Sequence, residues 1–358
     1  MKIHPWMLFY IFKKVTNTRR VRTKHIFLSI CDHFEPLHNH ASDSTGLDRV
    51  RQWIDKYPAI VQGLKDADGC FPRHTFFYPI EEYRPEIMNE LADFCKSGYG
   101  EVEVHLHHDN DSSENLRKTL IDYKKLLFEK YGLLSRDKID QQIKYGFIHG
   151  NWALDNSRYD GRRCGINNEL DILKETGCYA DFTMPSAPDQ TQTTKINSIY
   201  YAVDDPLKPK SHNNGLNAKR SVNNNNGLLM VQGPLAINFK ERKWGVLPRI
   251  ENGDVSHSAR IRLKRLNLWI NAGISVTGAA ECVFIKLYTH GCQENNREYL
   301  LKNGINDLFK LAQDYACRQS VDLHFVTARE MVNIIKFLEN SDATVDFKQA
   351  RNYRYVRN

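Results

Sequence analysis

Short apolar runs that alternate with longer amphipathic segments constrain the fold of this chain more than any other feature. Strands are expected at residues 25–31, 74–78, 101–107, 145–149, 179–184, 228–232, 282–288 and 323–326. Helices are expected at 47–64, 85–96, 112–131, 167–175, 260–271 and 297–317, and residues 327–330 form a capping box that opens a last helix. A strand-then-helix order predicts parallel strands with crossover helices, and this many strands indicates a closed α/β barrel.

The length of 358 residues allows either two domains or one elaborated barrel. No glycine-rich phosphate loop follows the first strand, which argues against a dinucleotide-binding fold. We expect a single elaborated domain with parallel inner strands. Along the chain we expect a basic and apolar N-terminal segment at 1–23, then the barrel at 24–340 with a polar loop insertion at 208–227, and then a peripheral C-terminal tail at 341–358.

Composition excludes several classes of protein. With 41% hydrophobic and 11% aromatic residues, the chain is neither disordered nor fibrous. A net charge of +7 over this length is a mildly basic surface, so no nucleic-acid partner is expected. Eight cysteines are scattered without a Cys-x-x-Cys pair, which excludes zinc ribbons and thioredoxin-type chemistry and indicates reduced thiols. We therefore expect a cytoplasmic protein.

The N-terminal segment allows two interpretations. Residues 6–12 are apolar but too few to span a bilayer, and Lys13, Lys14, Arg19 and Arg20 follow them. Residues 1–23 either make peripheral contact with the inner face of an anionic membrane or dock on the barrel as a strand or helix.

Polar side chains collect where four predicted strands end, which is where functional groups gather in parallel α/β barrels. These ends carry Asp32, His33 and Glu35; His105, His107, His108, Asp109, Asn110 and Asp111; His149, Asn151, Trp152, Asp155 and Asn156; and His290. Imidazoles and carboxylates in such density predict a site for zinc or another first-row divalent ion.

The densest group, at residues 105–111, has two interpretations. Because strand residues alternate between faces, His105 and His107 share one face and His108 points to the other. His107 and Asp111, four residues apart across the following turn, could close on one metal ion. Alternatively, Asp111 followed by Glu114 only caps the next helix.

The third strand end resembles a saccharide-binding loop. Asn151, Trp152, Asp155 and Asn156 combine an aromatic ring with amide and carboxylate groups, and such sets stack on sugars and form hydrogen bonds with them. The same residues are also compatible with loop packing. His149 fits either a supporting role beside a metal ligand or a structural one.

These strand ends resemble the polysaccharide deacetylase-like superfamily, the NodB-homology proteins of carbohydrate esterase family 4, over about residues 25–340. The resemblance implies a distorted (β/α)7 barrel, a divalent metal that is usually zinc, and removal of N- or O-acetyl groups from sugars. The stretch from His149 to Pro188 looks like a branch associated with surface-polysaccharide gene clusters, which implies a surface polysaccharide or its precursor as substrate.

The resemblance also implies roles for single residues. The family's first motif, two adjacent aspartates, falls on Asp32 and His33, so Asp32 would be the catalytic base and His33 a metal ligand. Its second motif, two histidines four apart after a Glu-apolar pair, falls on His107 and Asp111, and His105 is the substitute ligand or supporting partner. The late motif places the catalytic histidine at His290, while an Arg-Pro-rich strand end of the family is replaced by residues 149–152.

The expected function is a metal-dependent carbohydrate deacetylase. Asp32 would take a proton from the attacking water, and His290 would protonate the leaving amine or alcohol. One alternative is a glycoside hydrolase on the same barrel, which would use two carboxylates from Asp32, Glu35, Asp155 and Asp181. The other is a saccharide-binding barrel without catalysis.

Overall fold

The computed structural model describes residues 5–16, 21–222, 226–243, 246–340 and 346–357. Its strands are β1 (His25–His33), β2 (His74–Pro79), β3 (Gly100–Leu106), β4 (Ser135–Asp137), β5 (Ile143–His149), β6 (Cys178–Asp181), β7 (Ile199–Ala202), β8 (Leu216–Asn217), β9 (Leu228–Val231), β10 (Ala236–Lys243), β11 (Leu247–Glu251), β12 (Cys282–Thr289), β13 (Asp322–Phe325) and β14 (Tyr355–Val356). Its α-helices are α1 (Pro5–Thr16), α2 (Asp43–Val61), α3 (Pro85–Lys96), α4 (Ser113–Lys125), α5 (Glu169–Thr176), α6 (Leu263–Asn271), α7 (Glu294–Tyr299), α8 (Ile305–Gln319), α9 (Ala328–Asn340) and α10 (Phe347–Ala350).

A largely parallel central sheet organises the molecule. Its hydrogen-bonded order is β12-β1-β2-β3-β5-β6-β9-β7-β8. Neighbours from β12 to β9 are parallel, whereas β7 is antiparallel to both β9 and β8. β13 pairs with the first half of β1, and β2 pairs with its end. The expected α/β class with parallel inner strands is therefore confirmed.

The closed barrel is not confirmed. Among the described strands, the hydrogen-bonded order has two ends, at β12 and β8. The side chain of Lys286 on β12 nevertheless reaches across the concave side, where its Nζ donates to the carbonyl oxygen of Phe182 at 2.6 Å. The sheet is thus strongly curled.

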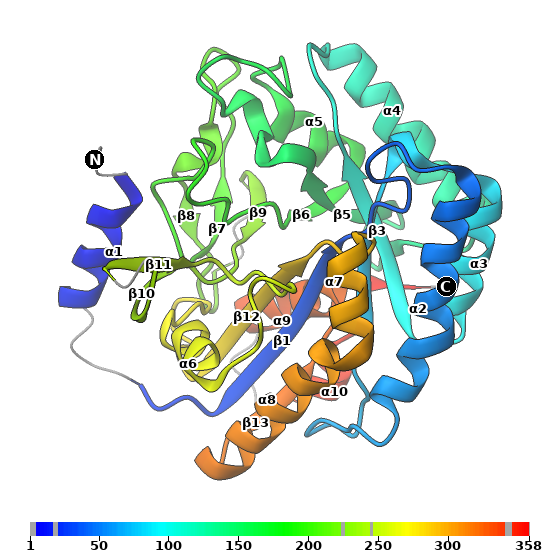
Figure 1. Cartoon of the computed structure of the whole chain (residues 1–358). Helices are drawn as coiled ribbons and strands as arrows, with labels where there is room; N and C mark the ends of the chain where they lie inside the picture. The colour runs from blue at the N-terminus through cyan, green and yellow to red at the C-terminus, as the bar shows by residue number, and fades with distance from the viewer. Residues whose placement is uncertain (1–4, 17–20, 223–225, 244–245, 341–345, 358) are drawn as a thin grey trace.

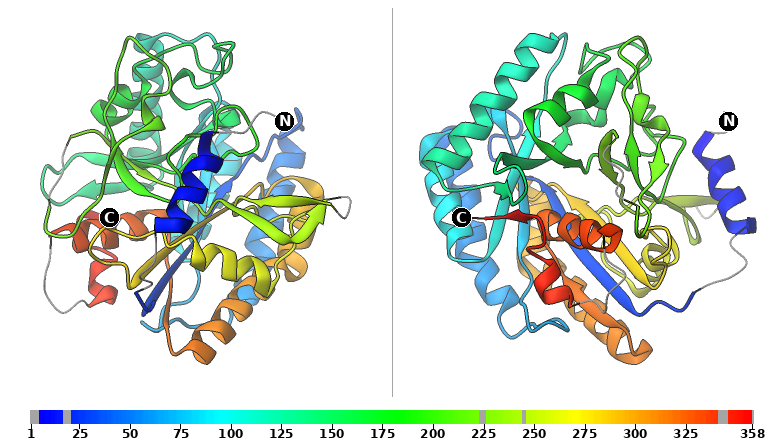
Figure 2. Two further views of the ribbon diagram at one scale, coloured as in Figure 1. Left: turned by 90° about the vertical axis from the view of Figure 1, so that its left-hand side faces the viewer. Right: turned by 180° about the vertical axis from the view of Figure 1, so that it is seen from behind.

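The two faces of the sheet pack into different cores. Ile26, Leu28 and Ile30 of β1 belong to the core shared with α2, α3, α4 and α8, whereas Phe27 and Cys31 belong to the core shared with α9. Figure 1 shows α2, α3 and α4 along one side of the sheet, and Figure 2 shows α9 and α10 from behind. Because successive residues alternate between these faces, each strand end presents one side chain to the helix layer and the next to the concave side.

The predicted elements are largely confirmed, with limits that differ by a few residues. The capping box is formed by Thr327 and Glu330: the Thr327 hydroxyl accepts from Glu330 N–H at 3.2 Å, and the Glu330 carboxylate accepts from Thr327 N–H at 3.0 Å. Sequence patterns missed β4, β7, β8, β14 and the hairpin β10–β11, because these strands are short or strongly polar.

Both ends of the chain pack on the body of the protein. Helix α1 lies close to the β10–β11 hairpin (Figure 1). Trp6 and Tyr10 of α1 are buried beside Leu235 and Ala236, while Leu8 and Ile11 are exposed. The segment 346–356 is not the peripheral tail that we expected, since β14 pairs with β4 and Arg351 is 3% exposed. The predicted insertion at 208–227 contains β8. Of the described helices, none combines the length and apolar character needed to cross a membrane.

Candidate metal centre

Histidines surround the carboxylate of Glu35 on the concave side of the sheet. The Oε1 atom of Glu35 lies 3.3 Å from Nε2 of His105 and 3.5 Å from Nε2 of His107, and its Oε2 atom lies 3.3 Å from Nδ1 of His38. The ring of His33 lies 5.0 Å from that of His105. Glu35 thus joins groups from two strand ends.

The strands dictate this convergence. His33 is the last residue of β1, and Glu35 follows it by two residues. His105 lies near the end of β3, and His107 follows it by two. Residues two apart face the same side of a sheet, so both pairs point to the concave side.

Contacts at the other ring nitrogen, Nδ1, orient two of these imidazoles. Nδ1 of His105 lies 2.9 Å from the carbonyl oxygen of Ile148, and Nδ1 of His107 contacts the carboxylate of Glu81. Both rings therefore present Nε2 to Glu35. Metal-binding histidines are commonly held in this way, with the second ring nitrogen on a carboxylate or carbonyl.

One ligand atom each from His33, Glu35 and His105 lies within 4.8 Å of the others, so these residues could hold a metal ion. Burial keeps the pKa of His33 well below its ordinary value. Burial opposes ionisation of Glu35, but hydrogen bonds from His105 and His38 hold its pKa well below its usual range. A neutral imidazole and an ionised carboxylate are the forms that bind metal.

His33 and Glu35 line a cavity of about 390 Å³ together with Glu82, Asn151, Trp152 and His290, whereas His105 is fully buried and is not part of the lining. Asn151 and Trp152 have φ angles of 56° and 57°, a left-handed conformation that residues other than glycine seldom adopt. Such backbone is typical of segments that place side chains in a binding site.

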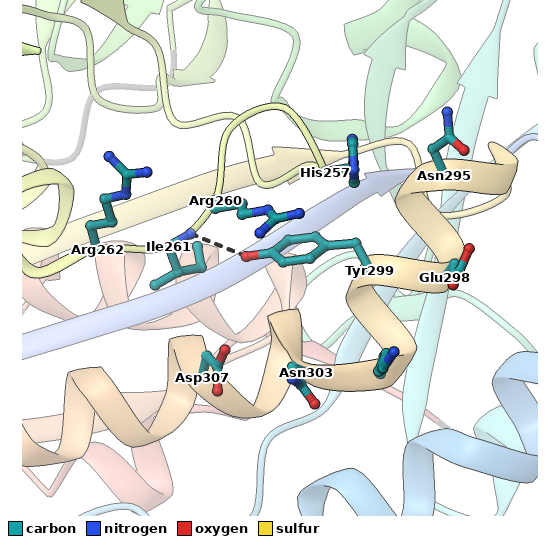
Figure 3. A pocket seen from close by; sticks show the side chains of 10 residues that line it. His257, Arg260, Ile261, Arg262, Asn295, Glu298, Tyr299, Asn303 and Asp307 are labelled. Carbon is teal, nitrogen blue, oxygen red and sulfur yellow. Dashed lines mark hydrogen bonds between the residues drawn. The ribbon is translucent and has the colours of Figure 1, made fainter.

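Two further hollows continue from the cavity. One of about 280 Å³ shares His38, Asn39 and Gln293 with it. That hollow shares His257 and Asn295 with the next, of about 590 Å³, where Tyr299 accepts a hydrogen bond from the backbone of Ile261 (Figure 3). The polar side chains in Figure 3 come from α7, the π-helical turn Leu300–Gly304, α8 and the segment before α6.

His290, predicted as a catalytic residue, lies on the cavity wall with its ring stacked on His33 at 4.7 Å. Asp32, its predicted partner, is fully buried on the helix side of β1. Its Oδ2 atom lies 2.9 Å from Nε2 of His74, and its Oδ1 atom accepts from Gly291 N–H at 2.7 Å. Asp32 thus holds the segment that carries His290, and the cavity lining does not include it.

Asp111 does not join His33 and His107, so the predicted ligand set needs correction. Its Oδ2 atom lies 3.0 Å from Nδ1 of His108, and its Oδ1 atom accepts from Ser112 N–H at 2.7 Å at the start of α4. The turn after β3 points Asp111 to the helix side, and Glu35 takes the place of the predicted carboxylate.

The residues predicted for substrate binding divide into two groups. Asn151 and Trp152 line the cavity. His149 and Asp155 are fully buried, and Asn156 lines a separate hollow beside residues 203–214. His149 has the same parity as Tyr145 and Phe147, whose side chains lie in the helix-side core, so it points away from the cavity.

The sequence interpretation missed Glu35 as a metal-binding group, as well as His38 and Glu82. The sequence places Glu35 in the first strand-end group and offers it as a glycosidase carboxylate but not as a ligand, although its spacing of two from His33 puts both on one face. Burial, with repulsion from Glu35, raises the pKa of Glu82 to about 7. The short helix at Ile80–Glu82 brings this carboxyl to the cavity, and no residue spacing indicates that contact.

Two other groups of metal-binding side chains occur in the described part of the chain. His108, His149, Cys164 and Glu169 form one, and Asp66, Asp68 and His324 form the other. In the second, the guanidinium of Arg351 already lies 2.5 Å from Asp66 and 2.8 Å from Asp68, so a cation occupies that place. A comparison of the sequence with protein-family models gives no match, and a comparison with curated proteins gives no significant similarity.

Proposed function

We propose that this chain is a metal-dependent hydrolase that removes an acetyl group from a sugar, on a distorted (β/α)7-type barrel similar to that of the polysaccharide deacetylases. One observation carries the proposal: the buried His105 converges with His33 and Glu35, and these two line a cavity to which Trp152 and His290 also belong. The cluster supplies metal ligands, and the ring of Trp152 supplies a surface on which a sugar can stack.

His33, Glu35 and His105 would hold the metal, with His107 beside them. Two imidazoles and a carboxylate suit zinc, and catalytic zinc sites use three protein ligands. The ion supplies a Lewis acid that polarises a carbonyl and activates water. His105 and His107 are already oriented toward Glu35 by their Nδ1 contacts.

The proton transfers fall to groups on the cavity wall. His290 is the proton donor for the leaving amine or alcohol, and Asp32 positions it through the Gly291 backbone. Asp32 cannot reach a substrate in this arrangement, because both of its oxygens are engaged. Glu82 is the carboxyl group on the wall that is placed to accept a proton from water.

The hollows that continue from the cavity favour an extended saccharide over a monosaccharide. Their linings share residues from one hollow to the next, and their polar groups suit hydroxyl and amide groups of sugars. The substrate in this proposal is an acetylated chain of a surface polysaccharide or its precursor, modified in the cytoplasm. The exposed Leu8 and Ile11 of α1 are compatible with contact at the inner membrane face.

A second candidate function is glycoside hydrolysis. Glu35 and Glu82 line the same cavity, and two carboxyl groups on one cavity are the requirement of most glycosidases. Asp155 and Asp181, which the sequence offered for this reaction, are buried away from the cavity lining.

Product analysis separates these functions. Acetylated oligosaccharides are incubated with zinc-loaded protein, and free acetate and new reducing ends are measured. The proposal predicts acetate without reducing ends, and about a 10²–10⁴-fold slower release by His290→Gln. His25→Gln, at the opposite end of β1, is the control and should retain activity. Reducing ends without acetate would support glycoside hydrolysis. The absence of both acetate and new reducing ends would overturn both proposals.

A further inference from the structure

A second cluster of metal-binding side chains lies on the helix side of the sheet, away from the cavity. It consists of His108 after β3, His149 at the end of β5, Cys164 in the following loop and Glu169 at the start of α5. One ligand atom of each lies within 4.8 Å of the others. His149, Cys164 and Glu169 are fully buried, and the His108 side chain is 7% exposed.

The distances in this cluster are those of a small coordination shell. Around tetrahedral zinc, neighbouring ligand atoms are about 3.3–3.8 Å apart, given bond lengths of about 2.0–2.3 Å. Oε1 of Glu169 lies 3.2 Å from Nε2 of His108 and 3.7 Å from Nε2 of His149, and its Oε2 lies 3.4 Å from Sγ of Cys164. These three separations match those of neighbouring ligands, and one atom from each of the four side chains lies within 4.8 Å of the others.

Both imidazoles are oriented as metal-binding histidines usually are. Nδ1 of His108 lies 3.0 Å from the Asp111 carboxylate, and Nδ1 of His149 contacts the carbonyl oxygen of Gly150. Each ring therefore turns Nε2 toward Glu169. A carboxylate or carbonyl on the far nitrogen fixes the tautomer and strengthens the ligand.

A hydrogen-bonded network without metal would leave one atom unexplained. A protonated His108 between Asp111 and Glu169 satisfies those three side chains. Nε2 of His149, however, is buried and has no hydrogen-bond partner among the residues that the structure describes. Buried polar atoms nearly always have a partner, so an orphan nitrogen aimed at a carboxylate and a thiol indicates a missing ligand.

Charge and backbone contacts favour a divalent cation at this place. A thiolate and a carboxylate carry two negative charges, which one divalent ion neutralises. Two hydrogen bonds hold the Cys164 loop against the turn after β3: Asp111 N–H donates to the Cys164 carbonyl oxygen at 3.0 Å, and Arg163 N–H donates to the Asp109 carboxylate at 2.6 Å. The ligands are thus pre-positioned by the chain.

We propose that His108, His149, Cys164 and Glu169 bind a structural zinc ion, with Asp111 as the residue that orients His108. Four protein ligands in a buried place leave no open position, which is typical of structural zinc. On binding, the Cys164 thiol and Nε2 of the protonated His108 each give a proton to solvent, and the thiolate and the freed Nε2 bond to zinc, while Nδ1–H of His108 stays on Asp111. The ion ties the ends of β3 and β5 to α5 and so supports the loop that carries Asn151 and Trp152.

Cobalt(II) in place of zinc tests this site without reference to catalysis. The full-length reduced protein is loaded with cobalt(II), and its absorption spectrum is recorded. We expect the near-ultraviolet sulfur-to-cobalt charge-transfer band and the visible bands of tetrahedral cobalt. The group of His33, Glu35 and His105 contains no thiol, so this band reports the second site alone.

Matched variants assign the band. Cys164→Ser should lose it and bind one metal ion fewer. Cys178→Ser should keep it: Cys178 is another buried thiol that, like Cys164, lies near a backbone carbonyl oxygen, here 3.2 Å from that of Ala180. His33→Ala should lose one ion but keep the band. Asp111→Asn should bind cobalt about 10–100-fold more weakly.

Two results would overturn the site. One is folded wild-type protein that binds cobalt but does not show the thiolate band, and this experiment does not depend on the folding of any variant. The other is Cys164→Ser protein that keeps the band. Wild-type protein that shows the band but releases no acetate would instead count against the proposed function and leave this site standing.

Discussion

Consecutive residues at a strand end serve opposite sides of the sheet in this protein. Asp32 points to the helix layer and holds the His290 segment, while His33 points to the concave side and the group that could hold a metal ion. The same rule sends His107 to Glu35 and His108 to Glu169. The end of β3 therefore contributes to two clusters with distinct environments, one on each side of the sheet.

At the residue scale, the buried Lys286 makes stability depend on pH. Burial lowers its pKa from the ordinary 10.5 to about 8. Between these values the unfolded chain binds more protons than the folded protein, so this residue makes the free energy of unfolding rise as pH rises from about 8 to about 10.5. Lys286→Met should remove that contribution.

Urea unfolding of both proteins at several pH values measures the effect. The stability difference, wild type minus Lys286→Met, should increase between pH 8 and pH 10.5. Taking the difference cancels the titration of other groups. A difference that stays constant or falls would show that Lys286 keeps an ordinary pKa in the fold.

At the scale of elements, α9 depends on its capping box. The reciprocal bonds between Thr327 and Glu330 satisfy two backbone N–H groups at the start of a helix whose side chains are mostly buried. Thr327→Ala should lower the free energy of unfolding by about 1 kcal/mol, measured by urea unfolding.

Thr327→Ser is the matched control, because it keeps the hydroxyl. It should retain most of the capping contribution. Equal losses in the serine and alanine variants would mean that packing of the threonine methyl group, and not the cap, accounts for the effect.

Elements with a clear hydrophobic periodicity or a local capping motif could be predicted from the sequence, whereas very short strands could not. The strand at 282–288 and the capping box at 327–330 are local patterns, and the structure has both. β8 and β14 have two residues each and exist because of their partners, β7 across a polar loop and β4 far along the chain. No local pattern records such a partner, so the sequence could not indicate them.

The candidate site also has one part that the sequence predicts and another part that it does not. Alternation along the strand alone predicts that His105 and His107 share a face. The same rule also predicts that His33 and Glu35 share a face. Assigning Asp111 to them failed, because the turn after β3 reverses its direction. Cys164 and Glu169 meet His108 only through the folding of a long loop, which spacing does not encode.

At the scale of the whole molecule, the C-terminal segment is fastened by a buried ion network. Arg351 contacts Asp66, Asp68 and Glu330 and donates to the carbonyl oxygen of Phe325. Arg351→Ala would leave buried carboxylates without their cation, and we expect a loss of about 3–5 kcal/mol in the free energy of unfolding.

The surface pair of Arg51 and Glu90 provides the comparison. The Arg51 side chain is 52% exposed, so Arg51→Ala should change stability far less. Urea unfolding of the two variants tests the ranking. If Arg351→Ala lowers the free energy of unfolding no more than Arg51→Ala does, the ion network of the C-terminal segment contributes little to the stability of the fold.

The location of bound zinc tests the central claim most directly. Crystals of the full-length protein grown with zinc are measured at the zinc absorption edge, and an anomalous difference map locates the ion. The account predicts a peak between the side chains of His33, Glu35 and His105 in the wild type and no peak there in Glu35→Ala. A wild-type map without density at this place, while zinc is bound elsewhere in the molecule, would contradict it.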